Sequence, residues 1–317
     1  MRALALLRFG DRPSVQEIAV PSVDDAALIR VTFAGVNPID YLLIDQLSAA
    51  SKFPFVVGLD FAGIIERASP HRPDLSAGDR VFGIARAYGS YTEYTVVSPK
   101  LEGEALARIP PGVSDDQAAA LPIPGVTALR SIEWLDVQAG QRVLVMGATG
   151  AVGGFAVQIA SSRGAEVYAT AFGNLDEAYR LGSQEAYDAK SSDALAILRT
   201  RHPNGIDAIL DLVNGPNTIQ NDVNVLKKGG KLVSTRYAAD QQWFSERGVT
   251  TLNISSKTNP LASTDGLTRL GEMLANGRIS ARIHRSAELD DASSILQQLR
   301  SGALGGKTVI HIGQENK

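Results

Sequence analysis

The chain has 317 residues, of which 44% are hydrophobic, and its formal net charge at pH 7 is −3. This length suits two globular domains, and the slightly acidic balance lacks the broad positive field that would attract nucleic acid or an anionic membrane. The chain contains no cysteine, which excludes disulfides, thiolate nucleophiles and every zinc site with a cysteine ligand.

The N-terminal part of the chain is predicted to form a β-rich domain. Its first apolar run is interpreted as a strand, because it lacks the length and the cleavage site of a leader. Short β-prone segments separated by Gly and Pro follow, a spacing typical of a compact barrel: LIRVTFAGVNP, FPFVVGLDFAGIIERA, AGDRVFGIA and GSYTEYTVVS. No segment reaches the roughly 18 uninterrupted apolar residues of a membrane span, so we expect a cytoplasmic protein.

A change of pattern near Ala118 predicts the start of a second domain. Ser114 precedes an Ala-rich segment and is the expected N-cap of its helix. From Gln141 onward, strand-like runs alternate with helical segments, which predicts a doubly wound α/β domain over residues 119–255. The predicted strands are RVLVMG, AEVYATA, IDAILDLV and GKLVST, and the predicted helices lie near 151–160, 175–181, 193–199 and 217–226.

The last part of the chain is predicted to return to the first domain. The strand-like run VTTLNIS precedes helices near 265–276 and 290–300 and a final strand, KTVIHI. These last elements are too few to bury a core of their own. We therefore expect residues 256–317 to complete the β-rich domain of residues 1–118.

Four glycines stand in the stretch VLVMGATGAVGG, which links the first predicted α/β strand to a helix. In a dinucleotide-binding turn, one glycine turns the chain, one lets the backbone approach the pyrophosphate, and one lets the helix pack closely on the strand. The helix that follows presents free N–H groups and a positive dipole end to the anion. The sequence therefore predicts a phosphate site at Gly147, Thr149, Gly150, Ala151, Val152 and Gly153, with a turn that binds nothing as the alternative.

The end of the second α/β strand indicates which dinucleotide binds. An acidic residue about 20 positions after the glycines would bond the ribose hydroxyls of NAD, but Thr170 stands there. A small neutral residue leaves room for the 2′-phosphate of NADPH, with Arg180 or Lys190 to neutralise it. Asp176 lies close by and keeps NADH open, and a solvated helix residue is the alternative for Arg180.

Six motifs distributed along the chain occur in the order of a known family: AGVNPIDY, FPFVVGLDFAG, GDRVFG, AAALPIPGVTAL, GQRVLVMGATGAVGGFAVQIA and LKKGGKLVS. On these motifs the chain resembles the zinc-independent quinone oxidoreductases of the medium-chain dehydrogenase/reductase superfamily. The resemblance implies a GroES-like catalytic domain, a Rossmann domain and a homodimer. It also implies NADPH-dependent hydride transfer to a quinone or to the activated double bond of an enone.

The resemblance also bears on zinc. In zinc alcohol dehydrogenases the position held here by Asn37 is a ligand cysteine, and the position held by Leu59 is a histidine, so those ligands are missing. The four histidines show no metal-ligand spacing: they are His71, His202, His284 and His311. We expect no metal, so hydrogen-bond donors must stabilise the charge that develops on the substrate oxygen, and this favours reduction.

Candidate catalytic residues cluster in the motif GVNPIDY. Asn37 is the best candidate donor, because the resemblance places its amide at the cleft, whereas stabilising a turn before Pro is the alternative. Asp40 and Tyr41 follow closely. Tyr41 is a candidate proton donor, but many relatives carry the tyrosine one position later, so a packed aromatic is the alternative.

Three further residues are expected to contact the cofactor. Thr127 matches a family position that contacts the nicotinamide, with a hydroxyl bonded within its own helix as the alternative. Val213 and Asn214 follow IDAILDL at the carboxyl end of a strand, where open α/β sheets bind ligands. Two other functions stay open: an enoyl-thioester reductase of lipid or polyketide metabolism, and a low-turnover NADPH-binding sensor.

Overall fold

The computed structural model describes residues 1–317 apart from 23, 99, 102, 191–192, 255–262 and 314–317. The chain divides into two compact units, which we call the β-rich unit (Met1–Val126 with Pro260–Lys317) and the α/β unit (Thr127–Asn259). The division lies inside helix α3 (Pro122–Leu135), whereas the sequence predicts a boundary at Ala118. Pro124 and Gly125 lie just before the division, but α3 continues through both, so neither residue ends a structural element there. The boundary predicted between 255 and 256 lies outside the described residues.

The described residues of the β-rich unit form two sheets. One has the order β2-β1-β4 and the other the order β15-β16-β3-β5-β6-β8, with β7 paired to β3. Its helices are α1 (Pro38–Asp45), α2 (Asp115–Ala119), α8 (Thr264–Ala275) and α9 (Ala292–Arg300), with the 3-10 helix η2 (Leu289–Asp291). Its strands are β1 (Arg2–Leu6), β2 (Ser14–Glu17), β3 (Ala27–Gly35), β4 (Phe55–Val56), β5 (Asp60–Arg67), β6 (Arg80–Ile84), β7 (Tyr94–Val97), β8 (Ala105–Arg108), β15 (Ile283–Glu288) and β16 (Lys307–His311).

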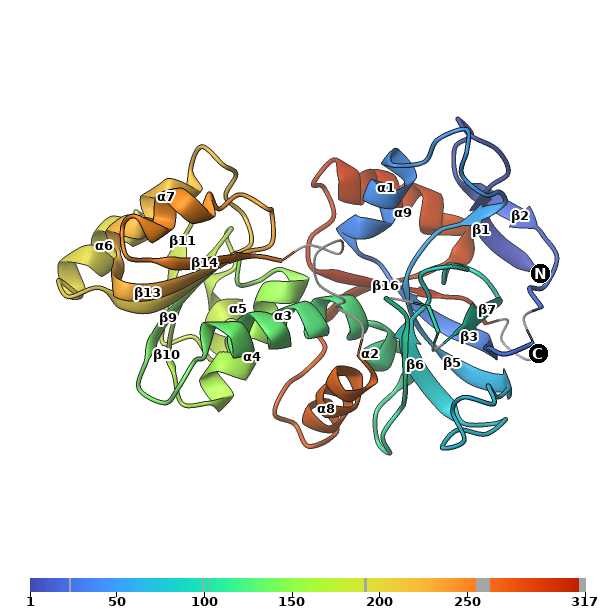
Figure 1. The fold of residues 1–317 in the computed structure, drawn as a ribbon. Coiled ribbons are helices and arrows are strands. Elements are labelled where there is room, and N and C mark those ends of the chain that lie inside the picture. Colours follow the sequence, from blue (N-terminus) through green and yellow to red (C-terminus); the bar gives the residue numbers. More distant parts are fainter. Residues whose placement is uncertain (23, 99, 102, 191–192, 255–262, 314–317) are drawn as a thin grey trace. The chain divides into compact units, whose positions relative to one another are not determined.

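The described part of the α/β unit forms one six-stranded sheet in the order β11-β10-β9-β12-β13-β14, and all its pairings are parallel. Figure 1 shows helices α4 and α5 on one face of this sheet and α6 and α7 on the other. The predicted doubly wound parallel sheet is therefore confirmed. The elements are β9 (Arg142–Met146), α4 (Ala151–Ser162), β10 (Glu166–Ala171), α5 (Leu175–Arg180), β11 (Glu185–Asp188), α6 (Ala194–Arg201), β12 (Ile206–Asp211), the 3-10 helix η1 (Ile219–Asn224), β13 (Leu226–Ser234), α7 (Gln241–Ser245) and β14 (Thr250–Asn253).

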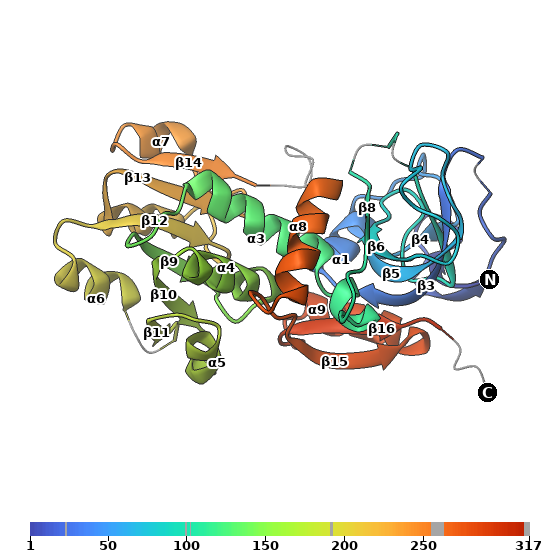
Figure 2. The same cartoon turned by 90° about the horizontal axis from the view of Figure 1, so that it is seen from below.

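The last strand of the chain lies beside one of the first. β16 pairs antiparallel with β3, with Val309 opposite Gly35 and His311 opposite Phe33. Figure 2 shows β15 and β16, in red, next to the blue β3. This pairing brings Lys307 next to the start of α1.

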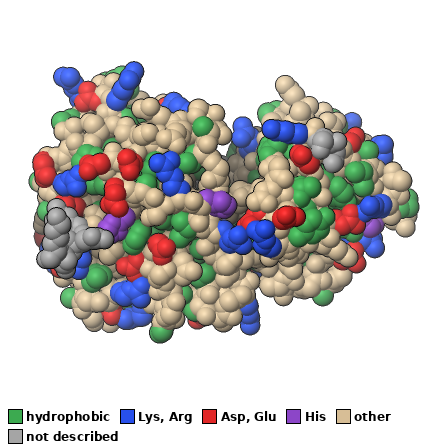
Figure 3. Space-filling model, turned by 180° about the vertical axis from the view of Figure 1, so that it is seen from behind, with side chains coloured by type: hydrophobic (Ala, Val, Ile, Leu, Met, Phe, Trp, Pro, Cys, Tyr) green, Lys and Arg blue, Asp and Glu red, His purple; other side chains and the backbone are tan. Residues whose placement is uncertain are grey.

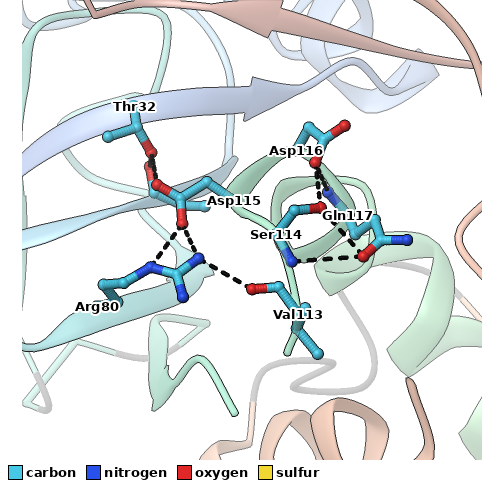
Figure 4. Close-up of polar contacts among 8 residues, drawn as sticks. Thr32, Arg80, Val113, Ser114, Asp115, Asp116 and Gln117 are labelled. Atoms are coloured by element: carbon cyan, nitrogen blue, oxygen red, sulfur yellow. Dashed lines mark hydrogen bonds and ion pairs between the residues drawn. The ribbon is translucent and has the colours of Figure 1, made fainter. Parts of the chain in front are cut away.

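Helix α2 is tied to the sheet of the β-rich unit by polar contacts around its first residue. The Asp115 carboxylate accepts hydrogen bonds from Thr32 Oγ1 (2.7 Å) and from Arg80 Nε (3.0 Å), which lie on β3 and β6 (Figure 4). The same arginine donates from Nη2 to the Val113 carbonyl (2.9 Å). Ser114 is the N-cap of α2, as predicted. These contacts fix the segment that leads into α3.

The sequence prediction fails for some short elements. The helix predicted near 217–226 is the short 3-10 helix η1, because the segment follows Gly215 and Pro216 and contains three asparagines, which favour turns over α-helix. The sequence analysis predicts only β-prone segments in this part of the chain and does not predict helix α1. Its start is set by Pro38 in the first turn and by the Asp40 carboxylate, which accepts from the Asn37 N–H (2.7 Å).

Gly35 provides a test of the packing between β3 and α2. A Cβ at this position would lie 2.2 Å from the Ala119 carbonyl oxygen and 3.1 Å from Lys307 Nζ. We expect Gly35→Ala to lower the free energy of unfolding by about 1–3 kcal/mol, the usual cost of overpacking. Gly305→Ala is the matched control, because a Cβ there meets no heavy atom within 4 Å. Chemical denaturation followed by circular dichroism measures both variants, and equal stabilities would contradict the clash.

Candidate active site and cofactor-binding turn

The glycine turn lies at the carboxyl end of β9 in the α/β unit. Gly147 has a φ of +84°, which favours glycine, and its N–H donates to the Thr170 carbonyl oxygen (3.1 Å). Gly150 is the N-cap residue of α4 and donates its own N–H to the Gly147 carbonyl (3.1 Å). The N–H groups of the first turn of α4 therefore point out of the helix end without an acceptor inside the helix.

Two of the glycines are required by close contacts. A Cβ at Gly153 would lie 2.2 Å from the Gly147 carbonyl oxygen, and a Cβ at Gly147 would lie 2.8 Å from Val213 Cγ1. The helix thus packs against the turn without a side chain between them, and its N–H groups at Ala151 and Val152 stay accessible to an anion. These residues fit the pyrophosphate of a dinucleotide.

The residues predicted to lie near the ribose of the dinucleotide and its 2′-phosphate have different surroundings. Thr170 is 4% exposed, and its Oγ1 accepts from the Gly147 N–H (3.3 Å). Its side chain therefore stabilises the glycine turn from the buried side. Arg180 forms an ion pair with Glu177 (3.1 Å). Lys190 Nζ lies 5.7 Å from the ring centroid of Phe172, an exposed residue directly after β10. The sequence analysis did not single out Phe172, which is the exposed residue at the carboxyl end of β10.

The segment after β12 is held by a buried carboxylate. Asp211 Oδ1 accepts from the N–H groups of Val213 and Asn214, both at 2.8 Å. This fixes the two predicted cofactor residues beside Gly147 at the carboxyl edge of the sheet. Thr127, on α3, is 6% exposed, and its carbonyl accepts from Ser131 Oγ (2.7 Å).

A second carboxyl group faces Asp211 in the α/β unit. Asp222, on η1, is fully buried, and its two oxygens accept no hydrogen bond of normal geometry from the described residues. Burial and then the negative charge of Asp211 raise the pKa of Asp222 to about 9. Asp222 is therefore protonated at neutral pH, and its O–H can donate to Asp211.

Asn37 lies in a buried polar cluster of the β-rich unit. Its amide Nδ2 donates to Asp60 Oδ2 (2.7 Å), and its Oδ1 accepts from Lys307 Nζ (2.8 Å). Lys307 also donates to the Val36 carbonyl (3.1 Å) and lies 3.5 Å from Asp60 Oδ2. The amide of Asn37 is thus held between a cation and an anion.

Asp40 belongs to the same cluster. Its Oδ2 accepts from the Asn37 N–H (2.7 Å) and from the hydroxyl of the buried Tyr91 (2.7 Å). Its Oδ1 has no hydrogen-bond partner among the residues that the structure describes. Asn37 and Asp40, two of the predicted catalytic residues, are therefore brought together.

Burial perturbs the ionisation of this cluster. Burial raises the pKa of Asp40 to about 7, against hydrogen bonds from Tyr91 and Asn37. It raises the pKa of Asp60 to about 6, against the positive charge of Lys307. It lowers the pKa of Lys307, against the charges of Asp60 and Asp40. The buried cluster therefore contains two carboxyl groups and one ammonium group, and burial favours a single ion pair with no excess charge.

Tyr41 lies in different surroundings from Asn37 and Asp40. It is half-buried, and the guanidinium carbon of Arg300, on α9, lies 5.1 Å from its ring centroid. Arg300 also pairs with Asp45 at the end of α1 (2.6 Å). This contact favours a packed aromatic over a proton donor, and the donor role of Tyr41 stays a prediction.

The sequence analysis missed Asp60, Lys307 and Tyr91, as well as Asp211 and Asp222. Asp60 and Asp211 stand inside otherwise apolar strand segments, GLDFAG and AILDLV, and Lys307 opens the apolar strand KTVIHI. A charged residue within such a run is the available signal, because it must find a partner when the strand is buried. Tyr91 carries no such signal.

The surface offers no concentrated charge on the face drawn in Figure 3, where Lys and Arg side chains are interspersed with Asp and Glu. Among the described residues, no three His, Asp or Glu side chains come close enough together to hold a metal ion. Every described helix is too short or too polar to cross a bilayer.

The sequence of this chain is similar to those of known proteins. Two family models match the chain, one for the alcohol dehydrogenase GroES-like domain (residues 23–110) and one for a zinc-binding dehydrogenase (residues 181–310). A quinone oxidoreductase of Sus scrofa is 32% identical over 245 residues, which cover 74% of this chain and 72% of that protein. A 2-methylene-furan-3-one reductase of Solanum lycopersicum is 29% identical over 310 residues, 93% of this chain and 74% of that protein.

A solved structure shares the fold. The quinone oxidoreductase of Escherichia coli, crystallised with NADPH, matches with a TM-score of 0.84 at 21% identity, covering 98% of this chain and 100% of that chain. The GroES-like domain and the dinucleotide-binding turn define an oxidoreductase of the medium-chain dehydrogenase/reductase superfamily. Within that superfamily, the chain belongs to the quinone oxidoreductase family.

Gly153 tests the packing of the phosphate turn. In Gly153→Ala the new Cβ must displace the Gly147 carbonyl, so we expect the dissociation constant for NADPH to rise by about tenfold or more. Gly154→Ala is the matched control on the same helix, because its Cβ would meet its nearest atom, Leu181 Cδ1, at 3.7 Å. Fluorescence titration with NADPH measures both. A control variant that weakens binding as much as Gly153→Ala would contradict this packing argument.

Asp222 predicts how stability changes with pH. Its pKa is about 9 in the folded chain and near 4 when unfolded, so the folded chain binds an extra proton between these values. The stabilisation is complete below about pH 4 and is lost as the pH rises toward about 9, by at most about 1.4 kcal/mol per pH unit. In Asp222→Asn the side-chain amide can still donate to Asp211 but does not titrate. We therefore expect the free energy of unfolding to depend less on pH, and the variant to be more stable than the wild type at pH 8–9.

The comparison needs a control for the lost charge. Asp176→Asn removes an exposed carboxylate from the same unit and should leave the pH dependence as in the wild type. Thermal unfolding followed by circular dichroism between about pH 6 and pH 9 gives the result. Parallel curves for Asp222→Asn and the wild type would show that Asp222 does not hold the extra proton.

Proposed function

We propose that the protein is an NADPH-dependent, zinc-independent reductase of quinones or of the activated double bonds of enones. The curated relatives support this choice of acceptor, because one is named a quinone oxidoreductase and another is named for the reduction of a methylene-furanone. When bound, the nicotinamide supplies a hydride, and the reduced acceptor also takes up one proton. The residues of the chain must bind, orient and stabilise charge.

The observation that carries the zinc-independent proposal is the contact between Lys307 and Asn37. Asn37 stands where zinc alcohol dehydrogenases have a ligand cysteine, and the Lys307 ammonium lies 2.8 Å from its side-chain oxygen. Leu59, at the position of the ligand histidine, offers no donor atom. A buried ammonium would repel a divalent cation at this point.

The same cluster supports Asn37 as a donor to the substrate. One N–H of its Nδ2 is taken by Asp60, whereas the contact of Nδ2 with the Gly35 carbonyl is long, at 3.4 Å. A donor in a long contact is the one that a developing oxyanion can attract. In this proposal Asp40 holds the Asn37 backbone, and the source of the proton is Tyr41 or solvent.

NADPH is preferred over NADH in this proposal. The residues at the end of β10, Thr170 to Phe172, carry no carboxylate that would repel a 2′-phosphate or bond a 2′-hydroxyl. Lys190 lies over the exposed Phe172 ring and is the better placed of the two predicted cations, since Arg180 is paired with Glu177. Its charge is proposed to meet the 2′-phosphate.

A homodimer is also part of the proposal. β14 is an edge strand of the sheet in the α/β unit, and an edge strand can pair with its copy across a two-fold axis. The predicted strand there extends to Ser255, which lies outside the described residues.

A purified-protein assay tests the function. Oxidation of NADPH and of NADH is followed against a quinone, a small enone and an enoyl thioester, each with and without a chelator. We expect faster turnover with NADPH, on the quinone or the enone, and no loss with the chelator. Loss of activity on chelation would contradict zinc independence, and preference for the thioester would indicate the lipid or polyketide reductase. Tight NADPH binding without turnover on any acceptor would indicate the sensor.

A further inference from the structure

Lys307 is an unusual residue in the β-rich unit, because its ammonium is almost completely buried. Its side chain is 4% exposed, and it lies at the first position of β16. Three acceptors surround Nζ: Val36 O at 3.1 Å, Asn37 Oδ1 at 2.8 Å and Asp60 Oδ2 at 3.5 Å. An ammonium has three donors, so none is left for a substrate.

The contacts of Lys307 decide which way the Asn37 amide faces. With the carbonyl oxygen toward Lys307 and the NH₂ toward Asp60, each end of the amide meets the opposite charge. The flipped amide would set an NH₂ against an ammonium and a carbonyl against a carboxylate, and both contacts would repel. In a buried site such a pair of contacts fixes a single orientation.

We infer that Lys307 is a positioning residue, which acts on the reaction by orienting the Asn37 amide and holding the position of its NH₂ group. This inference rests on the proposed function, in which Asn37 donates to the substrate oxygen. Lys307 itself touches no substrate. Its position is provided by the pairing of β16 with β3, where Val309 lies opposite Gly35.

The charges around Lys307 provide a second measure of the same contact. The titratable groups of its cluster are Asp60 on β5, Asp40 on α1 and the Tyr91 hydroxyl, which donates to Asp40. The positive charge of Lys307 lowers the pKa of Asp60 and of Asp40 against the effect of burial. Removal of that charge raises both pKa values, so any pH dependence that these carboxyls impose on turnover moves to higher pH.

A double-mutant cycle between Lys307 and Asn37 tests the inference. We expect Lys307→Met to lower kcat by about tenfold to a hundredfold, the usual effect of losing a charge-assisted hydrogen bond, with a dissociation constant for NADPH within about twofold of the wild type. Asn37→Ala should lower kcat similarly, and the double variant should lose no more than Asn37→Ala alone. The cycle would overturn the inference if the two losses multiplied, or if Lys307→Met kept full kcat.

Charge-keeping and charge-removing controls complete the kinetic test. Lys307→Arg keeps the cation and should recover part of kcat, with a pH profile close to that of the wild type. Lys307→Met should shift the profile to higher pH, and a superposable profile would contradict the inference. Lys100→Met removes an exposed lysine of the same unit, which pairs with Asp25, and should change neither kcat nor the profile.

A measurement without turnover separates this inference from the proposed function. In the wild type labelled at asparagine, the two side-chain amide protons of Asn37 should give separate, slowly exchanging NMR signals, assigned by their loss in Asn37→Ala. In Lys307→Met, or in Lys307→Gln if the first variant fails to fold, they should exchange faster. Unchanged protection would overturn the inference. A wild type that shows the signals but reduces no acceptor would instead overturn the proposed function.

Discussion

The pairing of β16 with β3 is the constraint on which the candidate site depends. It joins a strand from the end of the chain to one from its beginning and carries Lys307 to the start of α1, where Val36 and Asn37 accept from it. Without a cation at this point, Asp60 would be a buried carboxylate whose donors among the described residues are the Asn37 amide and the Ile123 N–H. The loop geometry around Asn37 and the charge balance of the β-rich unit therefore share one cause, which is long-range in sequence.

Contacts between residues distant in the chain are also what the sequence could not predict, whereas features with local signals could be predicted. The parallel sheet was predictable because its strands are apolar runs of regular spacing, and the glycine turn because a strand precedes it and a helix follows. Both signals are local. The partners of Asn37 were not predictable, since Asp60 and Lys307 lie 23 and 270 residues away in the chain. A charged residue in an apolar strand indicates that a partner exists and says nothing of which residue it is.

Thr170 illustrates a different gap between pattern and structure. The sequence places it at the expected distance from the glycines, and the structure does place it at the end of β10, but its hydroxyl turns inward to the Gly147 N–H. Phe172 comes two residues later, after the end of β10, where the regular alternation of side chains no longer decides the facing direction. A count of about 20 residues does not locate the end of a strand to within two residues, so the sequence does not single out the exposed Phe172.

The two units stabilise their buried carboxyl groups differently. In each unit the difference suits the residues that the carboxyl group holds in place. In the β-rich unit Asp60 is matched by a cation, so its charge is kept and can fix the dipole of the Asn37 amide. In the α/β unit Asp222 is matched by a proton, which leaves Asp211 as the single anion that holds the N–H groups of Val213 and Asn214. A cation beside Asp211 would compete with these N–H groups for its oxygens, whereas a protonated carboxyl adds one hydrogen bond and no charge. The segment expected to meet the cofactor therefore keeps its shape by an acid that must stay neutral, and the Asn37 turn by a lysine that must stay charged.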